Sequence, residues 1–184
     1  RGLGDVYKRQ EEGLLSRGEH LTFESSASDR GLKMNFGKKY RKGDFTIFVS
    51  VETDGQPLHG TVCKGKNWSW EADSASFKPC LTVGKQTVRS CNVLGTADSW
   101  LRYGRGTNGK WYPVEPYSRF TLAVVAEGGR LTTYVNGLVD QSMEGDCDLR
   151  DLLLGACNGR IGSYAVYHRA LNPAEIARLD SQCR

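Results

Sequence analysis

Residues 130–179 contain the segments that decide the fold: R-L-T-T-Y-V-N-G at 130–137, L-L-L-G-A at 152–156 and R-I-G-S-Y-A-V-Y-H-R-A-L-N-P-A-E-I-A-R-L at 160–179. Their β-branched, aromatic and leucine side chains favour strands. Asn136-Gly137 suits a tight hairpin because both residues tolerate positive φ. This stretch therefore predicts antiparallel strands joined by short turns.

The same stretch ends in a helix signal. Asn172 can cap a helix, Pro173 suits its first position, and Glu175 can reach back to the cap. Ile176 and Leu179 then share one face of the helix, which we expect to dock on the sheets. The sequence thus predicts one short C-terminal helix.

Further strand-like runs fill the rest of the chain. Phe45, Ile47 and Val49 point to one side of their run, and Thr46 and Phe48 to the other. Turn signals recur about every eight to twelve residues, which is typical of a sandwich or barrel. We expect strands at 21–23, 32–36, 45–52, 60–64, 68–72, 76–83, 87–93, 99–104, 119–126, 131–135, 149–156 and 161–168.

Size and charge limit the classes of function. A chain of 184 residues suits one domain, and its formal charge of +4 comes without a nucleic-acid-binding motif. No apolar run approaches the roughly 18 residues of a membrane span. We therefore expect neither a nucleic-acid partner nor a membrane span.

The N-terminus reads R-G-L-G-D-V-Y-K-R-Q over residues 1–10. It has no hydrophobic periodicity and resembles the translated sequencing-adapter text found at the ends of metagenomic gene calls. We expect residues 1–19 to be a tail, partly non-native, and residues 20–184 to form the domain. We also expect any secretion signal to lie upstream of this fragment.

Six cysteines without a C-x-x-C pair favour disulfides in an oxidising compartment over a zinc site. We therefore expect an extracellular or cell-surface location. A turn at Lys85-Gln86 would pair Val83 with Val88 and place Cys80 opposite Cys91, within disulfide range. The pairing of the other four stays open, and buried free thiols are the alternative.

The order of segments from Phe45 onward resembles that of the laminin-G-like jelly rolls of the concanavalin A-like lectin/glucanase superfamily. The resemblance implies an all-β, two-sheet antiparallel jelly-roll sandwich with one short C-terminal helix. Members of this family are mostly secreted or surface-attached, and many bind glycans or proteins. The segments that carry the resemblance are Phe45–Ile47, Phe120–Val125, Leu131–Gly137, Leu152–Ala156, Arg160–Leu171 and Asn172–Ile176.

Aromatic residues in the middle of the chain provide the candidate ligand site. Trp68 and Trp70 alternate on one strand and project to the same face. Sugar rings stack on such side chains, but large aromatics also fill sandwich cores. Arg102, Tyr103 and Trp111 lie in the turn-rich region that follows. We expect these five residues to bind a glycan, and the core alternative stays open for the Trp pair.

Catalysis and calcium binding have weaker patterns. Glycosidases need two facing carboxylates, and the acidic pairs of this chain also read as strand ends, so we expect no catalytic residue. Asp146, Asp148 and Asp151 cluster on one loop and are candidates for calcium, without a glycine-bearing twelve-residue loop. We expect a non-catalytic glycan-binding module with no cofactor. The alternatives are a polysaccharide hydrolase or lyase, and a protein–protein adhesion module.

Overall fold

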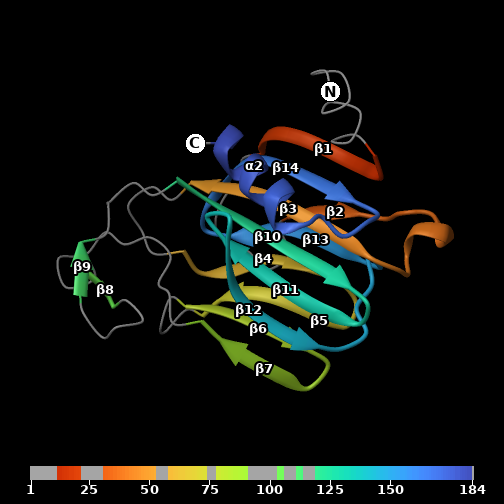
Figure 1. Ribbon diagram of the computed structural model, residues 1–184, viewed down its shortest axis with the longest axis horizontal. Coiled ribbons are helices and arrows are strands. Elements are labelled where there is room, and N and C mark those ends of the chain that lie inside the picture. Colours follow the sequence, from red (N-terminus) through yellow and green to blue (C-terminus); the bar gives the residue numbers. More distant parts are fainter. Residues whose placement is uncertain are drawn as a thin grey trace.

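The computed structural model describes residues 12–21, 31–52, 58–73, 78–90, 103–105, 111–113 and 119–183. Two six-stranded antiparallel sheets pack face to face, and a C-terminal helix covers part of the outer side of one of them (Figure 1). This arrangement confirms the predicted all-β sandwich with one short helix. None of the helices in these ranges is long and apolar enough to span a membrane.

The first sheet carries the helix. Its central strand β3 pairs with β14 on one side and β10 on the other, and all its pairs are antiparallel. In spatial order the strands are β1 (Leu14–Leu21), β14 (Arg160–Tyr167), β3 (Phe45–Glu52), β10 (Arg119–Glu127), β11 (Arg130–Val135) and β12 (Leu138–Glu144).

The second sheet lies on the other side of the core, and its pairs are antiparallel too. Two further strands, β8 (Tyr103–Arg105) and β9 (Trp111–Pro113), form a separate hairpin, and a short 3-10 turn η1 spans Lys38–Tyr40. In spatial order the second sheet has β2 (Leu32–Met34), β13 (Leu152–Cys157), β4 (Gly60–Lys64), β5 (Trp68–Ala72), β6 (Pro79–Val83) and β7 (Gln86–Arg89).

Strand β3 is buried on both of its faces. Phe45, Ile47 and Val49 point into the core between the sheets, as their alternation predicts. Phe48 points the other way and packs under the helix. Thr46 shares that outer face, where its hydroxyl donates to the Arg169 carbonyl at 2.9 Å. The strand therefore joins the core to the helix layer.

Helix α2 (Pro173–Cys183) packs on the outer face of the first sheet through Ile176 and Leu179, both buried. Each such side chain contributes roughly 1.5–3 kcal/mol of burial free energy. A polar contact adds to the docking, because the Thr121 hydroxyl donates to Asp180 Oδ1 at 2.5 Å. The predicted cap is confirmed: Glu175 N donates to Asn172 Oδ1 at 3.0 Å.

Hairpin β11–β12 confirms the predicted Asn-Gly turn. Asn136 and Gly137 have φ of 51° and 76°, the positive values that a type I′ turn needs. Strand β12 itself was not expected, because L-V-D-Q-S-M-E alternates poorly. The register between β11 and β12 shifts at Thr133/Tyr134, which indicates a β-bulge. A bulge reverses the side to which the following residues of the strand point, and this interrupts the alternation along β12.

Strand β1 corrects the predicted domain boundary. It pairs with β14 from Leu14 to Leu21, so residues 14–19 belong to the sandwich and not to a tail. The sequence L-L-S-R-G-E-H-L lacks the alternation of polar and apolar residues that marks a strand. Its partner β14 lies near the other end of the chain, so no neighbouring residues indicate the pairing. Residues 1–11 lie outside the described ranges.

Candidate functional site

The predicted tryptophan pair belongs to the core. Trp68 and Trp70 are 3% and 1% exposed, and both point toward the first sheet. The Trp68 ring stacks on Phe45 with centroids 5.6 Å apart, and its Nε1 donates to the Asp148 carbonyl at 2.8 Å. Neither indole face is accessible to a sugar. The prediction that they bind a glycan is wrong, because the facing sheet covers the side of β5 to which both residues point.

The other predicted ligand residues lie on or beside the small hairpin. Tyr103 begins β8, and Trp111 begins β9 opposite Arg105. Arg102 lies outside the described residues. The backbone thus places Tyr103 and Trp111 on neighbouring strands, and a role for them in ligand binding stays a prediction.

The three calcium candidates do not gather into a metal site. Burial opposes ionisation of Asp148, but hydrogen bonds from Arg150 outweigh it and hold the pKa of this carboxyl below its usual value. Arg150 donates through its backbone N at 2.9 Å and Nε at 2.7 Å. In the part of the chain that the structure covers, no group of three His, Cys, Asp or Glu residues is placed to hold a metal ion.

The predicted register around Cys80 is wrong. Strands β6 and β7 turn at Gly84, whose φ is 59°, and pair Val83 with Gln86 and Cys80 with Arg89. Cys91 lies outside the described residues, and Cys80 carries a free thiol. The alternative of buried thiols therefore holds at the cysteines that the structure describes, which are Cys63, Cys80, Cys147, Cys157 and Cys183, the last of them half-buried.

A pocket of about 240 Å³ opens on the outer face of the first sheet, where hairpin β10–β11 meets the entry to α2. We call it the hairpin–helix pocket. Strands β10 and β11 form one side, and the segment 170–173 forms the other. Its lining residues are Val125, Glu127, Arg130, Thr132, Tyr134, Ala170, Leu171, Asn172 and Pro173.

The strand side of the pocket follows from alternation. Arg130, Thr132 and Tyr134 are two residues apart on β11, so they share the outer face. Glu127 is directly opposite Arg130 across the Gly128-Gly129 turn. Arg130, Thr132 and Tyr134 belong to the stretch quoted first, and their period-two pattern was the signal that could have located the pocket. The sequence alone did not locate the pocket, because its other side is formed by segment 170–173, which is distant along the chain.

Tyr134 links the pocket to the helix layer. The residue is only 6% exposed and packs with Ile176 and Leu179, while also lining the pocket. Burial and the charge of Glu127 raise the pKa of its phenol. Among the described residues no group hydrogen-bonds its hydroxyl, and the hydroxyl oxygen is not one of the buried atoms that lack a partner, so it keeps access to solvent. The hydroxyl is therefore available to a ligand.

Some polar side chains of the strand side of the pocket already have a bonding partner, and others do not. Arg130 Nε lies 3.0 Å from Glu144 Oε1 on β12, which leaves the other guanidinium nitrogens available. The Thr132 hydroxyl lies 3.3 Å from the Ser142 hydroxyl. The Glu127 carboxylate bonds no other described residue. The pocket therefore offers both donors and acceptors.

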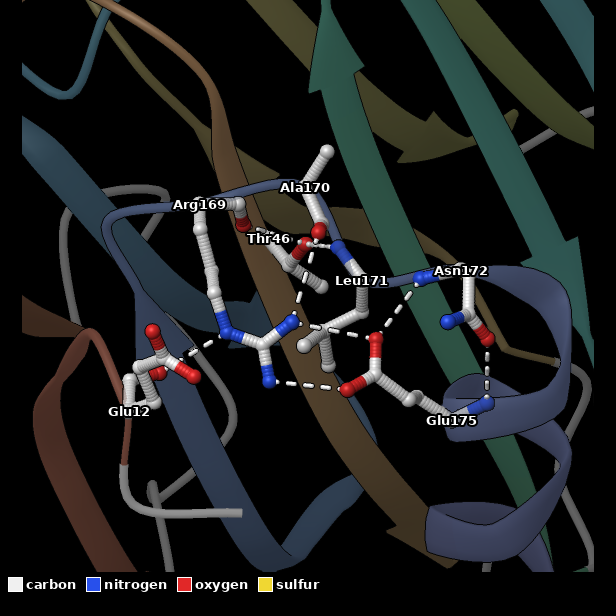
Figure 2. Close-up of polar contacts among 7 residues, drawn as sticks. All are labelled: Glu12, Thr46, Arg169, Ala170, Leu171, Asn172 and Glu175. Carbon is white, nitrogen blue, oxygen red and sulfur yellow. Dashed lines mark hydrogen bonds and ion pairs between the residues drawn. The ribbon is translucent and has the colours of Figure 1, made fainter. Parts of the chain in front are cut away.

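The helix side of the pocket is a braced segment (Figure 2). Glu175 receives hydrogen bonds from both terminal nitrogens of Arg169, at 3.0 and 2.9 Å, and from Asn172 N at 2.9 Å. Leu171 N donates to the Thr46 hydroxyl at 2.9 Å. Arg169 Nε also donates to the Glu12 carbonyl at 2.8 Å. These bonds fix the backbone of 170–173 against the sheet before any ligand arrives.

The comparisons concern the fold. No family model matches this chain, and no curated protein matches it. The CBM40 module of the Ruminococcus gnavus IT-sialidase, solved with α2,6-sialyllactose, has a TM-score of 0.56 at 13% identity. It matches 91% of this chain and 100% of its own.

Two structures of the binding domain of botulinum neurotoxin DC are similar as well. The complex with SialylT has a TM-score of 0.56 at 15% identity, and that with rat synaptotagmin II has 0.53 at 14%. Each match covers 92% of this chain but only 45% and 46% of the toxin chains, so this chain spans about half of their length. Identities this low establish the fold alone, and that fold is the two-sheet β-sandwich.

Proposed function

We propose that this chain is a non-catalytic carbohydrate-recognition module, secreted or displayed at a cell surface, which holds a sugar in the hairpin–helix pocket. The proposal includes membership of the laminin-G-like branch of the concanavalin A-like sandwiches. It rests on one observation above all. The pocket combines apolar walls with unengaged donors and acceptors on a backbone that is already braced.

The lining matches the two surfaces of a sugar. Val125, Leu171 and Pro173 offer apolar contact to ring C–H groups, while Tyr134 and Arg130 offer hydrogen-bonding groups to hydroxyls. Small-molecule sites are typically apolar with a few convergent polar groups. The carbohydrate complex of the Ruminococcus gnavus module, on the same fold, supports a sugar as the ligand class.

The composition of the pocket supports binding without catalysis. Glycoside hydrolysis requires two carboxyl groups facing the bond that is cut. Glu127 is the single carboxylate among the described lining residues. A lyase requires a base, and a phenol whose pKa is raised, as that of Tyr134 is, loses its proton less readily. A hydrolase or lyase therefore has less support than a binding module.

A glycan array with reducing-end release measured in parallel tests this proposal. We expect binding to one class of glycan and no release of new reducing ends. Release above a heat-denatured control would contradict the non-catalytic part. Absence of binding to every glycan on the array would contradict carbohydrate recognition.

Trp111→Ala separates the pocket from the β8–β9 hairpin as the site. Trp111 is one of the sequence-predicted ligand residues, and it lies on β9. If the pocket holds the sugar, this variant binds the same glycans with unchanged affinity. A loss of binding with the thermal midpoint preserved would move the site to the hairpin.

Protein adhesion is the second candidate function. Leu138 and Val139 are 74% and 62% exposed at the start of edge strand β12. Exposed large apolar residues at a sheet edge are typical of contact surfaces. Binding of a protein partner that is abolished by Leu138→Ser, with glycan binding absent, would favour this function.

A further inference from the structure

We infer that the hairpin–helix pocket accepts one uncharged sugar residue at the end of a chain and discriminates against the same residue carrying a carboxylate. This inference rests on the proposed function and specifies its ligand. It follows from the volume of the pocket, from the charges around it and from the donors and acceptors that its residues leave available.

The volume limits the ligand to a single ring. The pocket has a volume of about 240 Å³. Sites for larger ligands span about 300–1,000 Å³. One sugar ring fits, and a second ring has to lie outside the pocket. The residue bound is therefore the end of a chain or of a branch.

The walls limit the ligand in the same way. The segment 170–173 is bonded to β3 through Thr46 and to α2 through Glu175. It stands against the hairpin β10–β11 on one side of the pocket. Opening the pocket into a groove for an internal stretch of chain would break these bonds. The braced backbone thus favours a terminal residue.

The local charge selects against acidic sugars. Glu127 and Arg130 line the pocket, and Arg130 Nε is paired with Glu144 Oε1 at 3.0 Å. These three side chains carry one positive and two negative charges, a net charge of −1. A carboxylate on the ligand would lie near the negative charge of Glu127. The one cation of the three, Arg130, is already paired with Glu144. Like charges about 4 Å apart repel by about 1 kcal/mol even in water.

The available hydrogen-bonding groups suit hydroxyls. Glu127 accepts, Arg130 donates through its terminal nitrogens, and the Tyr134 hydroxyl can do either. The side-chain oxygen of Asn172 accepts from Glu175 N, which leaves the side-chain nitrogen as the group of Asn172 that can donate to a ligand. A sugar hydroxyl donates once and accepts up to twice, so adjacent hydroxyls can satisfy both kinds of group.

The experiment uses matched ligands on the full chain. Binding of the methyl glycosides of glucose, galactose and mannose is measured by ligand-observed NMR, together with the corresponding methyl uronides, which differ only in the carboxylate at C6. We expect one neutral glycoside to bind at least fivefold more tightly than its uronide. Oligosaccharides of the preferred sugar should bind no more than about twofold more tightly than the single residue.

Three variants locate the effect. Tyr134→Phe removes one hydroxyl and should weaken the neutral sugar about three- to tenfold, the effect of one hydrogen bond. Glu127→Gln removes the charge and should bring the uronide to within twofold of the neutral sugar. Glu71→Gln makes the same change on the second sheet and should alter neither affinity. Thermal melting of each variant confirms that it folds.

The outcomes separate this inference from the proposed function. Glycan binding that is unchanged in folded Tyr134→Phe and Glu127→Gln would overturn the pocket while leaving carbohydrate recognition intact. Uronides that bind as tightly as neutral sugars, or affinity that rises steadily with chain length, would overturn the specificity. No binding of any sugar, on the array or by NMR, would overturn the proposed function itself.

Discussion

Glu175 should contribute measurable stability through its bonds to the segment that walls the pocket. Glu175→Gln keeps the shape of the side chain and removes its charge and one of its two acceptor oxygens. The wild-type carboxylate takes two hydrogen bonds from Arg169, at 2.9 and 3.0 Å, and one from Asn172 N. Both charged side chains are 25% exposed, so solvent screens the pair only in part.

The magnitude follows from these bonds. A hydrogen bond to a charged group contributes roughly 1.5–3 kcal/mol. Because glutamine retains one acceptor and the pair is partly exposed, we expect a loss of about 1–2 kcal/mol at pH 7. For a chain of this size, that loss lowers the melting temperature by about 2–8 °C. Urea unfolding followed by tryptophan fluorescence measures it.

The effect should depend on pH with a defined sign. Hydrogen bonds from Arg169 lower the pKa of Glu175 from its usual 4.5 despite burial. A carboxyl whose folded pKa is lowered stabilises the fold fully above its unfolded pKa and loses this contribution as the pH falls through the folded value. The gap between wild type and variant should be constant from pH 6 to 8 and should narrow as the pH falls below the unfolded pKa of about 4.3.

Glu144→Gln is the matched control. Glu144 pairs with Arg130, but their side chains are 73% and 58% exposed, so we expect a loss well under 1 kcal/mol. The reasoning about Glu175 fails if its variant is as stable as wild type at pH 7, if the gap does not narrow on acidification, or if the control loses as much.

Two further predictions concern the core. Gly65→Ala should destabilise the protein by about 1–3 kcal/mol in urea unfolding, because the added Cβ would meet Trp68 Nε1 and the Asp148 carbonyl and disrupt their hydrogen bond. Unchanged stability would contradict the close packing of Gly65 against Trp68 and the Asp148 carbonyl. The thiols of Cys147 and Cys157 should stay unlabelled by a thiol reagent at pH 8 until the protein unfolds, because burial raises their pKa to about 12 and about 11. Rapid labelling of the folded protein at both positions would contradict their burial.

Local signals predicted most of the sandwich correctly. The alternation of Phe45, Ile47 and Val49, the Asn136-Gly137 turn and the Asn172 cap each depend on a few neighbouring residues. Such local preferences are retained in the folded protein because they agree with the tertiary structure. Strand β1 was missed because its pairing with β14 joins the two ends of the chain, and no local pattern reports such a partner.

The candidate site depended on packing that the sequence does not encode locally. Alternation correctly put Trp68 and Trp70 on one face of β5, but the opposite sheet decided that this face is the core. Likewise, Cys80 faces Arg89 because the turn at Gly84 begins earlier than predicted, and the register shifts with it.

The sequence by itself determined the all-β class, the hairpin that carries Arg130 and Tyr134, and the cap of the C-terminal helix. Only the tertiary structure decided that these elements form a pocket. Segment 170–173 is more than thirty residues from the hairpin along the chain, and it reaches Tyr134 because α2 buries Ile176 and Leu179 on the outer face of the same sheet. The physical reason is that burial of apolar surface acts across the whole chain, whereas turns and caps act within a few residues.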